Sequence, residues 1–155
     1  METAAAADHG WFGQPRGLSV LFFTEMWERF SYYGMRAFLM YFMVAPFAEG
    51  GLGFGLGRAG LVYGTYTMCV YLLAIPGGFV ADNIFGARRA VAIAGTIIAA
   101  GHFSLAFGSL GGFYLGLVLV AAGTGLLKPN LGTMVGALYP PGDLRRDAGF
   151  SIYYM

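Results

Sequence analysis

The chain has 155 residues, of which 57% are hydrophobic and only 11% are charged, and its formal net charge at pH 7 is +1. Soluble proteins carry roughly 25% charged residues, so this composition excludes a water-soluble domain and predicts an all-α integral membrane protein. The near-neutral charge, without a cluster of Lys and Arg, also excludes a nucleic-acid-binding protein.

Apolar stretches long enough to span a bilayer occur four times along the chain. We expect transmembrane helices at residues 18–46, 60–81, 90–108 and 113–138, and the start of a fifth helix near residue 147. Each of the four can cross a hydrocarbon core of about 30 Å at 1.5 Å per residue. The chain ends about nine residues into the fifth helix, where backbone groups would be unsatisfied in lipid, so we expect a longer protein.

The first predicted helix carries polar side chains in the middle of its apolar sequence: Glu25, Glu28, Arg29, Tyr32, Tyr33 and Arg36. At 100° per residue they fall within an arc of roughly 140°, and a charge near the centre of a bilayer costs on the order of 3 kcal/mol. We therefore expect this face of the helix to line a protein interior or a water-filled cavity. Two carboxylates beside two guanidinium groups form a titratable cluster suited to proton coupling. The alternative is an ion pair between Glu25 and Arg29 that only fixes helix packing.

The second and third predicted helices carry fewer chemical signals. We expect Tyr71 to face the same cavity, whereas Tyr63 and Tyr66 fit either the cavity or an aromatic belt at the membrane interface. The stretch "GLGRAG" at 55–60 matches a dinucleotide-binding pattern but follows no strand, so we expect no nucleotide site there. His102, in the third helix, is expected to be a packed side chain rather than a proton relay.

Lys128 is the anomaly of the fourth predicted helix, because it lies fifteen residues, or about 22 Å, beyond Phe113. Pro129 removes a backbone donor beside it and Asn130 adds a polar side chain, which predicts a local backbone opened toward an aqueous cavity. A buried ammonium group at this place is suited to hold a carboxylate. The alternative is a lysine whose side chain extends to the cytoplasmic surface.

The arginines in the loops predict the orientation of the chain. Five of them fall on one side of the membrane: Arg16, Arg88, Arg89, Arg145 and Arg146. Only Arg58 falls on the other side, so the positive-inside rule places the first group and the N-terminus in the cytoplasm. We expect a multi-pass protein of the cell membrane, inner or plasma.

Three segments resemble successive signatures of the proton-dependent oligopeptide transporter (POT/PTR) family of the major facilitator superfamily. They are "EMWERFSYYG" at 25–34, "GGFVADNIFGARR" at 77–89 and "KPNLGTMVGALYPPGDLRRDAGFSIYYM" at 128–155. The first matches the family pattern E-x-x-E-R-F-x-Y-Y-G in full. The resemblance implies a major facilitator helical bundle, in which residues 1–155 form part of the N-terminal six-helix bundle and a C-terminal helical bundle is the partner missing from this chain.

The same resemblance implies roles for individual residues. It assigns proton coupling to Glu25, Glu28 and Arg29. It places five residues at the substrate site: Tyr32, Tyr33, Arg36, Tyr71 and Lys128. Of these, the cations Arg36 and Lys128 would face the substrate carboxylate. We add Asn130 because of its position beside Lys128. It implies a cytoplasmic gate at Gly78, Asp82, Gly86, Arg88 and Arg89. The alternative for this segment is a solvated loop that only sets the topology.

We therefore predict a symporter that imports di- and tripeptides by alternating access, with protons as the coupling ion and no metal or other cofactor. Its expected partners are di- and tripeptides, protons and the lipid bilayer. Groups that hold the amino end of the peptide are expected in the missing half. Two alternatives are a proton-coupled carrier of another small anion, such as nitrate or a drug-like acid, and a structural or channel-like membrane subunit. An enzyme is not expected, because the sequence has neither a Cys/His metal-binding spacing nor a Ser/His/Asp arrangement.

Overall fold

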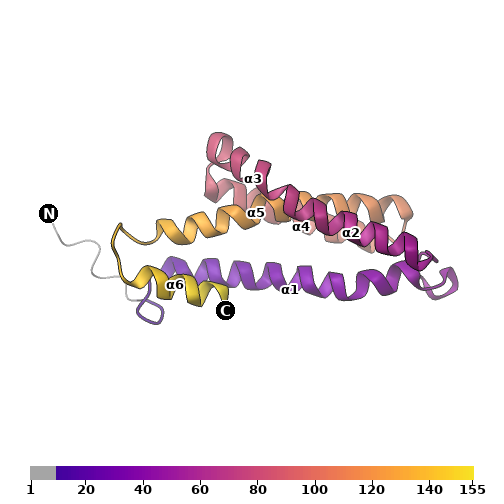
Figure 1. The fold of residues 1–155 in the computed structure, drawn as a ribbon, viewed down its shortest axis with the longest axis horizontal. Helices are drawn as coiled ribbons and strands as arrows, with labels where there is room; N and C mark the ends of the chain where they lie inside the picture. Colours follow the sequence, from indigo (N-terminus) through magenta and orange to yellow (C-terminus); the bar gives the residue numbers. More distant parts are fainter. Residues whose placement is uncertain (1–9) are drawn as a thin grey trace.

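The computed structural model describes residues 10–155, and within them every long element is a helix (Figure 1). In chain order the elements are α1 (Arg16–Val44), the short 3₁₀ helix η1 (Phe47–Glu49), α2 (Leu56–Leu72), α3 (Ala74–Val80), the π-helical turn η2 (Ala81–Phe85), α4 (Ala87–Ala106), α5 (Leu110–Ala137) and α6 (Arg145–Tyr154). The predicted all-α class is confirmed.

The second membrane helix is longer than expected. α2, α3 and η2 follow one another without a loop and together form one apolar helix, Leu56–Phe85. The expected break between residues 81 and 90 is reduced to Gly86, whose backbone N–H donates to the Ala81 carbonyl (2.7 Å) and closes the wide π turn. Gly86 has a φ of 75°, which glycine adopts without strain, so α4 begins at the next residue.

Charge distinguishes α1 from the other long helices. Of the helices in residues 10–155, three are long and apolar enough to cross a membrane by length and composition: Leu56–Phe85, Ala87–Ala106 and Leu110–Ala137. α1 has 29 residues, which is sufficient length, but it contains Glu25, Glu28, Arg29 and Arg36. A helix with four charges at membrane depth needs partners on other helices, so α1 is the element from which the site is built.

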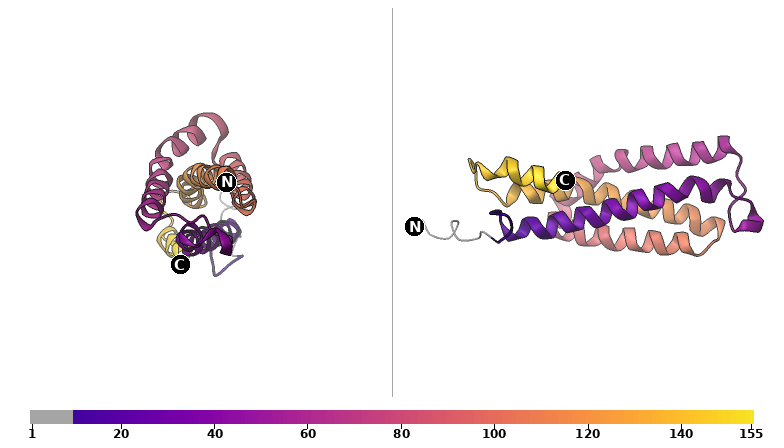
Figure 2. Two further views of the ribbon diagram at one scale, coloured as in Figure 1. Left: turned by 90° about the vertical axis from the view of Figure 1, so that its right-hand side faces the viewer. Right: turned by 90° about the horizontal axis from the view of Figure 1, so that it is seen from below.

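α5 is the central helix of the molecule and packs against α1, α2, α3, α4 and α6 (Figure 2). Its closest neighbour is α4, and glycines permit that approach. A Cβ atom at Gly116 would lie 2.6 Å from the side chain of Leu105, and one at Gly123 would lie 2.6 Å from that of Ile98. Small residues of this kind let the backbones of membrane helices come together, because lipid offers no hydrophobic drive for their association.

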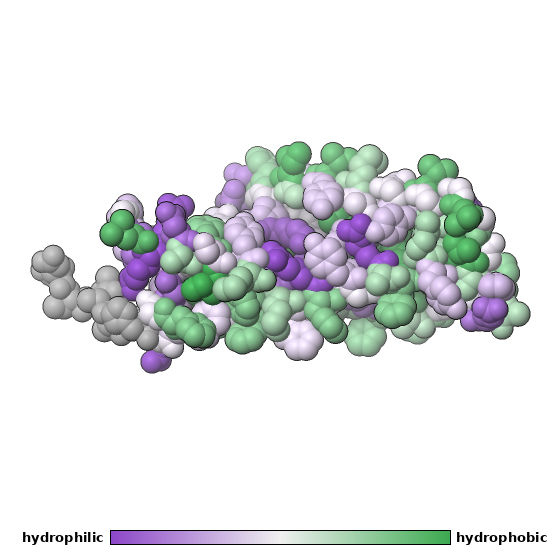
Figure 3. Space-filling model, turned by 60° about the horizontal axis from the view of Figure 1, so that its bottom comes forward, coloured by the Kyte–Doolittle hydropathy of each residue, from purple (hydrophilic) through white to green (hydrophobic). Residues whose placement is uncertain are grey.

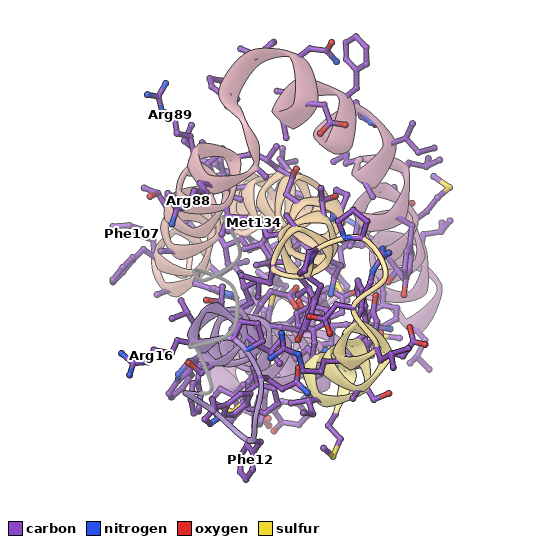
Figure 4. All side chains as sticks on the ribbon, turned by 90° about the vertical axis from the view of Figure 1, so that its left-hand side faces the viewer. Phe12, Arg16, Arg88, Arg89, Phe107 and Met134 are labelled. Carbon is purple, nitrogen blue, oxygen red and sulfur yellow. The ribbon has the colours of Figure 1, made fainter. Side chains whose placement is uncertain are left out.

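One end of the molecule gathers the start of α1, the turn from η2 to α4 and the loop from α5 to α6, and the loop from α1 to α2 lies at the other end (Figure 1). Arg16 begins α1, and Arg88 and Arg89 lie in the first turn of α4, so all three belong to the first of these ends. Figure 4, a view along the molecule, shows Arg16 and Arg89 pointing outward. The segment before α1 is fixed there, because the Tyr139 hydroxyl donates to Gln14 Oε1 (2.9 Å). Residues 1–9, which include the N-terminus, lie outside the described residues.

Candidate functional site

The polar face of α1 divides into a buried part and an exposed part. Glu25 and Glu28 are 5% and 6% exposed, and Tyr32 is also buried, whereas Tyr33 is open to the surroundings. Buried carboxylates need hydrogen-bond donors, so the donors that other helices supply determine the interactions of these two side chains. Hydrophilic side chains gather midway along the face shown in Figure 3, with apolar side chains on both sides.

Glu25 is held within α1 and by α6. Arg29 Nε donates to Glu25 Oε1 at 2.9 Å, one turn along the same helix. The Tyr153 hydroxyl donates to the second carboxylate oxygen at 3.1 Å, and Arg29 Nη1 donates to the Tyr154 carbonyl at 3.2 Å. The expected Glu25–Arg29 pair is therefore present, but it also attaches α6 to α1. Sequence reasoning missed Tyr153, although it lies within the last of the segments that resemble the family.

Glu28 forms an ion pair with a different helix. Lys128 Nζ, from α5, donates to Glu28 Oε2 at 3.0 Å, and the other oxygen, Oε1, is buried without a partner among the described residues. The structure therefore shows Lys128 turned inward onto a carboxylate one hundred residues away in sequence, and not extended to the cytoplasmic surface.

The surroundings of Lys128 differ from the expected opened backbone. α5 continues as an α-helix through Pro129 to Ala137. The Asn130 side-chain amide is fully buried and donates to the Leu126 carbonyl of its own helix at 2.6 Å. The Asn130 amide thus donates within α5, and no described hydrogen bond joins it to Lys128. A side chain two residues further along a helix points about 200° away, so the two side chains face different directions. The place of Asn130 at the substrate site stays a prediction.

Arg36 forms a second cationic centre one helical turn from Tyr32. Its Nε donates to the Tyr63 hydroxyl of α2 at 2.8 Å, and its Nη1 donates to the Tyr32 hydroxyl at 3.4 Å. The guanidinium carbon lies 5.3 Å and 5.0 Å from the ring centroids of Tyr32 and Tyr63. Lys128 Nζ lies 5.6 Å from the centroid of Tyr32, so one phenol ring contacts both cations. Tyr63 belongs to the site, which the sequence left undecided.

Tyr33 and Tyr71 are the two expected substrate residues that form no described hydrogen bond. Tyr71 is 65% exposed, but it is close enough to Tyr32 for an electrostatic interaction. Tyr33 interacts in the same way with Arg29 and packs edge-on against Tyr32, with ring centroids 5.4 Å apart. Both phenols thus border the buried cluster from the open side.

The expected gate residues lie at the end of the molecule where η2 meets α4. Gly78 faces Pro129 of α5, because a Cβ atom there would lie 3.7 Å from the proline ring. Asp82, Arg88 and Arg89 are exposed, and within residues 10–155 none of them forms an ion pair. The structure therefore places these residues at one end of the molecule, and their charged side chains form no ion pair with one another.

A different ion pair stabilises the loop before α6. Arg145 Nη2 lies 2.7 Å from Asp143 Oδ2, and the Arg145 backbone N–H donates to Oδ1 at 2.9 Å. These hydrogen bonds lower the pKa of Asp143 below its ordinary value. A carboxyl group with a depressed pKa stabilises the fold above its ordinary pKa and loses this contribution as the pH falls toward the lowered value. The pair is therefore intact throughout the neutral and mildly acidic range.

The family model of the POT family matches residues 88–155. Relatives extend the match to nearly all of the chain. This chain is 52% identical over 147 residues to the uncharacterized transporter YclF of Bacillus subtilis, and the aligned region covers 94% of this chain and 30% of the relative. It is also 46% identical over 157 residues to the di-/tripeptide transporter of Lactococcus lactis subsp. lactis, and that alignment covers 99% of this chain and 31% of the relative. The chain belongs to the POT family.

Solved structures of the POT family agree with the fold described above. The crystal structure of a peptide transporter POT in complex with sulfate superposes with a TM-score of 0.93 at 50% identity, over 97% of this chain and 31% of that one. The predicted major facilitator bundle is thereby confirmed. This POT-family chain spans slightly under a third of the length of the relatives it matches. Among residues 10–155, no group of His, Cys, Asp and Glu side chains is suited to hold a metal ion.

Proposed function

We propose that the protein is a proton-coupled symporter that imports di- and tripeptides by alternating access. The observation that carries this proposal is the buried Glu28–Lys128 ion pair between α1 and α5, beside the Arg36–Tyr32–Tyr63 cluster. A cation paired with a protonatable carboxylate can exchange that partner for the carboxylate of a substrate. The Lactococcus lactis relative, named a di-/tripeptide transporter, supports peptides as the substrate class.

Lys128 and Arg36 are the proposed ligands of the peptide carboxylate. Both contact the ring of Tyr32, so a carboxylate bound between them would lie against one phenol that is fixed by packing. Tyr33 and Tyr71 border this place from the open side and would contact the rest of the peptide. The groups that bind its amino end are expected outside these residues.

Proton coupling follows from competition for Lys128. When Glu28 is ionised, it holds the ammonium group; when Glu28 takes up a proton, the charge attraction is lost and Lys128 becomes available to a substrate carboxylate. Proton and peptide then favour the same state of the site, which is the thermodynamic requirement for symport. Glu25 and Arg29 would act beside this switch by attaching α6 to α1, through Tyr153, on the same face of the helix.

The remaining proposals concern the gate and the membrane. We propose that Gly78, Asp82, Gly86, Arg88 and Arg89 form a cytoplasmic gate whose charges bond across the interface between two helical bundles. The end that carries Arg16, Arg88 and Arg89 would face the cytoplasm of a cell membrane. The peptide would cross unchanged, without an enzymatic step, and protons would be the only coupling ion.

A carrier of another small anion is the second candidate. The site supports it because Lys128 and Arg36 both present donors suited to any carboxylate or oxyanion, and one related structure was solved with sulfate. This candidate predicts that nitrate or a drug-like acid competes with peptides or replaces them.

The test is uptake of a labelled dipeptide into liposomes that contain the full-length protein, with the outside acidified. We expect accumulation that collapses when a protonophore is added and in the variants Lys128→Ala and Glu28→Gln. Because Glu28→Gln keeps the shape of the side chain, it should retain peptide exchange without a gradient while losing proton-driven accumulation. Full gradient dependence in Glu28→Gln would exclude the coupling role, and accumulation of the small anions instead of peptides would favour the second candidate.

A further inference from the structure

Tyr66 has a buried hydroxyl group for which the mechanism above has no use. The side chain lies on α2, is 5% exposed and packs against Tyr32, with ring centroids 6.4 Å apart. Its hydroxyl oxygen has no hydrogen-bond partner among the described residues. A buried hydroxyl without a partner costs free energy, roughly 1–3 kcal/mol, so it calls for an explanation.

Glu28 presents the complementary group. One of its oxygens is held by Lys128, while Oε1 is buried and lacks a donor. Tyr66 interacts electrostatically with Glu28, Tyr32, Tyr63 and Arg36, so it belongs to the surroundings of this cluster. A phenol can donate one hydrogen bond, and an ionised carboxylate accepts several.

Two other buried side-chain atoms lack a described partner. Within residues 10–155 they are Thr67 Oγ1 and His102 Nε2. His102 lies on α4, which packs on α5, and has no charged neighbour that acts on it. Glu28 acts electrostatically on Tyr66, and both belong to helices that contact α5.

We propose that Tyr66 is a positioning residue for Glu28, and that its hydroxyl donates to Glu28 Oε1 during the transport cycle and stabilises the ionised carboxylate. This inference rests on the proposed function, because Glu28 is there the proton acceptor. Hydrogen bonds to a charged acceptor are stronger than those to a neutral one, so the Tyr66 hydroxyl opposes protonation of Glu28. Together with Lys128, it would set the external pH at which uptake begins.

Other charged groups act on Glu28 as well and have to remain unchanged in the test. On α1 these are Glu25 and Arg29, and on α5 it is Lys128. α6 contributes Tyr153, which bonds to Glu25 rather than to Glu28. Tyr66→Phe removes one oxygen atom and leaves all of these groups in place, so a change in the pH profile reports the hydroxyl itself.

The experiment measures proton-driven dipeptide uptake by the full-length protein in liposomes over a series of external pH values. Tyr66→Phe should shift the midpoint of the profile to higher pH by roughly one unit, because a charge-assisted hydrogen bond of ordinary strength corresponds to about that shift. The matched control is Tyr114→Phe, whose hydroxyl is paired at 3.5 Å with the exposed Arg58, and its profile should coincide with the wild type. An unchanged midpoint in Tyr66→Phe, or a shift to lower pH, would overturn the proposal.

A second measurement separates this inference from the proposed function. Difference infrared spectroscopy on the purified protein follows protonation of the Glu28 carboxyl group directly, with Glu28→Gln identifying its band. If the wild type shows no proton-driven peptide uptake, the proposed function fails, while a higher protonation midpoint of Glu28 in Tyr66→Phe would still support Tyr66 as its donor. Thermal unfolding verifies that Tyr66→Phe is folded. If Tyr66→Phe does not fold, Tyr66→Met, which also lacks the hydroxyl, takes its place.

Discussion

At the scale of single residues, the site depends on tyrosine hydroxyls as much as on charges. Arg36 is held by two phenols, Tyr63 on α2 and Tyr32 on α1, and Tyr63 accepts hydrogen bonds from Nε and from Nη2. A guanidinium group fixed in this way presents its remaining donors in one direction. We therefore predict that Tyr63 is a determinant of substrate affinity even though it carries no charge.

We expect Tyr63→Phe to raise the KM for a dipeptide roughly three- to tenfold, because the hydroxyl that accepts from Arg36 Nε and Nη2 is lost from a partly exposed site. Dependence on the proton gradient should be retained, since the Glu28–Lys128 pair is untouched. Concentration series of uptake measure both quantities. Tyr41→Phe, on the exposed face of α1, is the matched control. An unchanged KM would mean that Arg36 does not need Tyr63 to bind substrate.

At the scale of elements, the position of Lys128 depends on how closely α3 crosses α5. Gly77 lies against the backbone of Gly125, so that a Cβ atom at Gly77 would come within 2.8 Å of the Gly125 carbonyl carbon. Gly125 in turn is packed on Leu73, where an added Cβ atom would lie 2.7 Å from the leucine Cβ. The crossing is three residues from Lys128 in sequence, and a displaced α5 would move the ammonium group away from α1.

We expect Gly77→Ala to destabilise the folded protein by about 1–3 kcal/mol, because the added methyl group meets backbone, which cannot rotate away. Thermal unfolding in detergent measures the change. Gly60→Ala on α2 is the control, since nothing lies within 4 Å of an added Cβ atom there and alanine favours the helix. Equal stability of the two variants would show that the α3–α5 crossing can open without cost.

At the scale of the whole molecule, the two ends of the bundle carry different charge. Arg88 and Arg89 lie at the end formed by the start of α4, together with Arg16, while Arg58 is at the opposite end, near the start of α2, where its guanidinium carbon lies 4.0 Å from the centroid of Phe54. This asymmetry, rather than any single contact, predicts the orientation in the membrane.

Cysteine labelling in intact cells tests that orientation. Glu49→Cys in the α1–α2 loop and Leu144→Cys before α6 both occupy exposed positions, and Cys69→Ser removes the native thiol. We expect a membrane-impermeant maleimide to label Glu49→Cys in intact cells and Leu144→Cys only after permeabilisation. The reverse pattern would place the arginine-rich end outside and contradict the proposed direction of the gate.

Sequence by itself determined the class and the family of this protein. Charge is so costly within lipid that functional roles for Glu28, Arg36 and Lys128 could be predicted without any knowledge of their partners. Helical periodicity put the polar residues of α1 on one face, and the motifs indicated the POT family before any comparison. These signals are local, which is why a single chain reveals them.

Only the tertiary structure decided which side chains pair with one another. The ion-pair partner of Glu28 lies one hundred residues away, and Tyr153, the second partner of Glu25, lies 128 residues away, and no local pattern encodes such distances. For the same reason, Tyr63 could not be distinguished from an interfacial tyrosine, and the hydrogen bond from Asn130 to its own helix was not expected. Whether a polar side chain faces a partner or its own backbone depends on the rotation of each helix, and close packing of the neighbouring helices fixes that rotation.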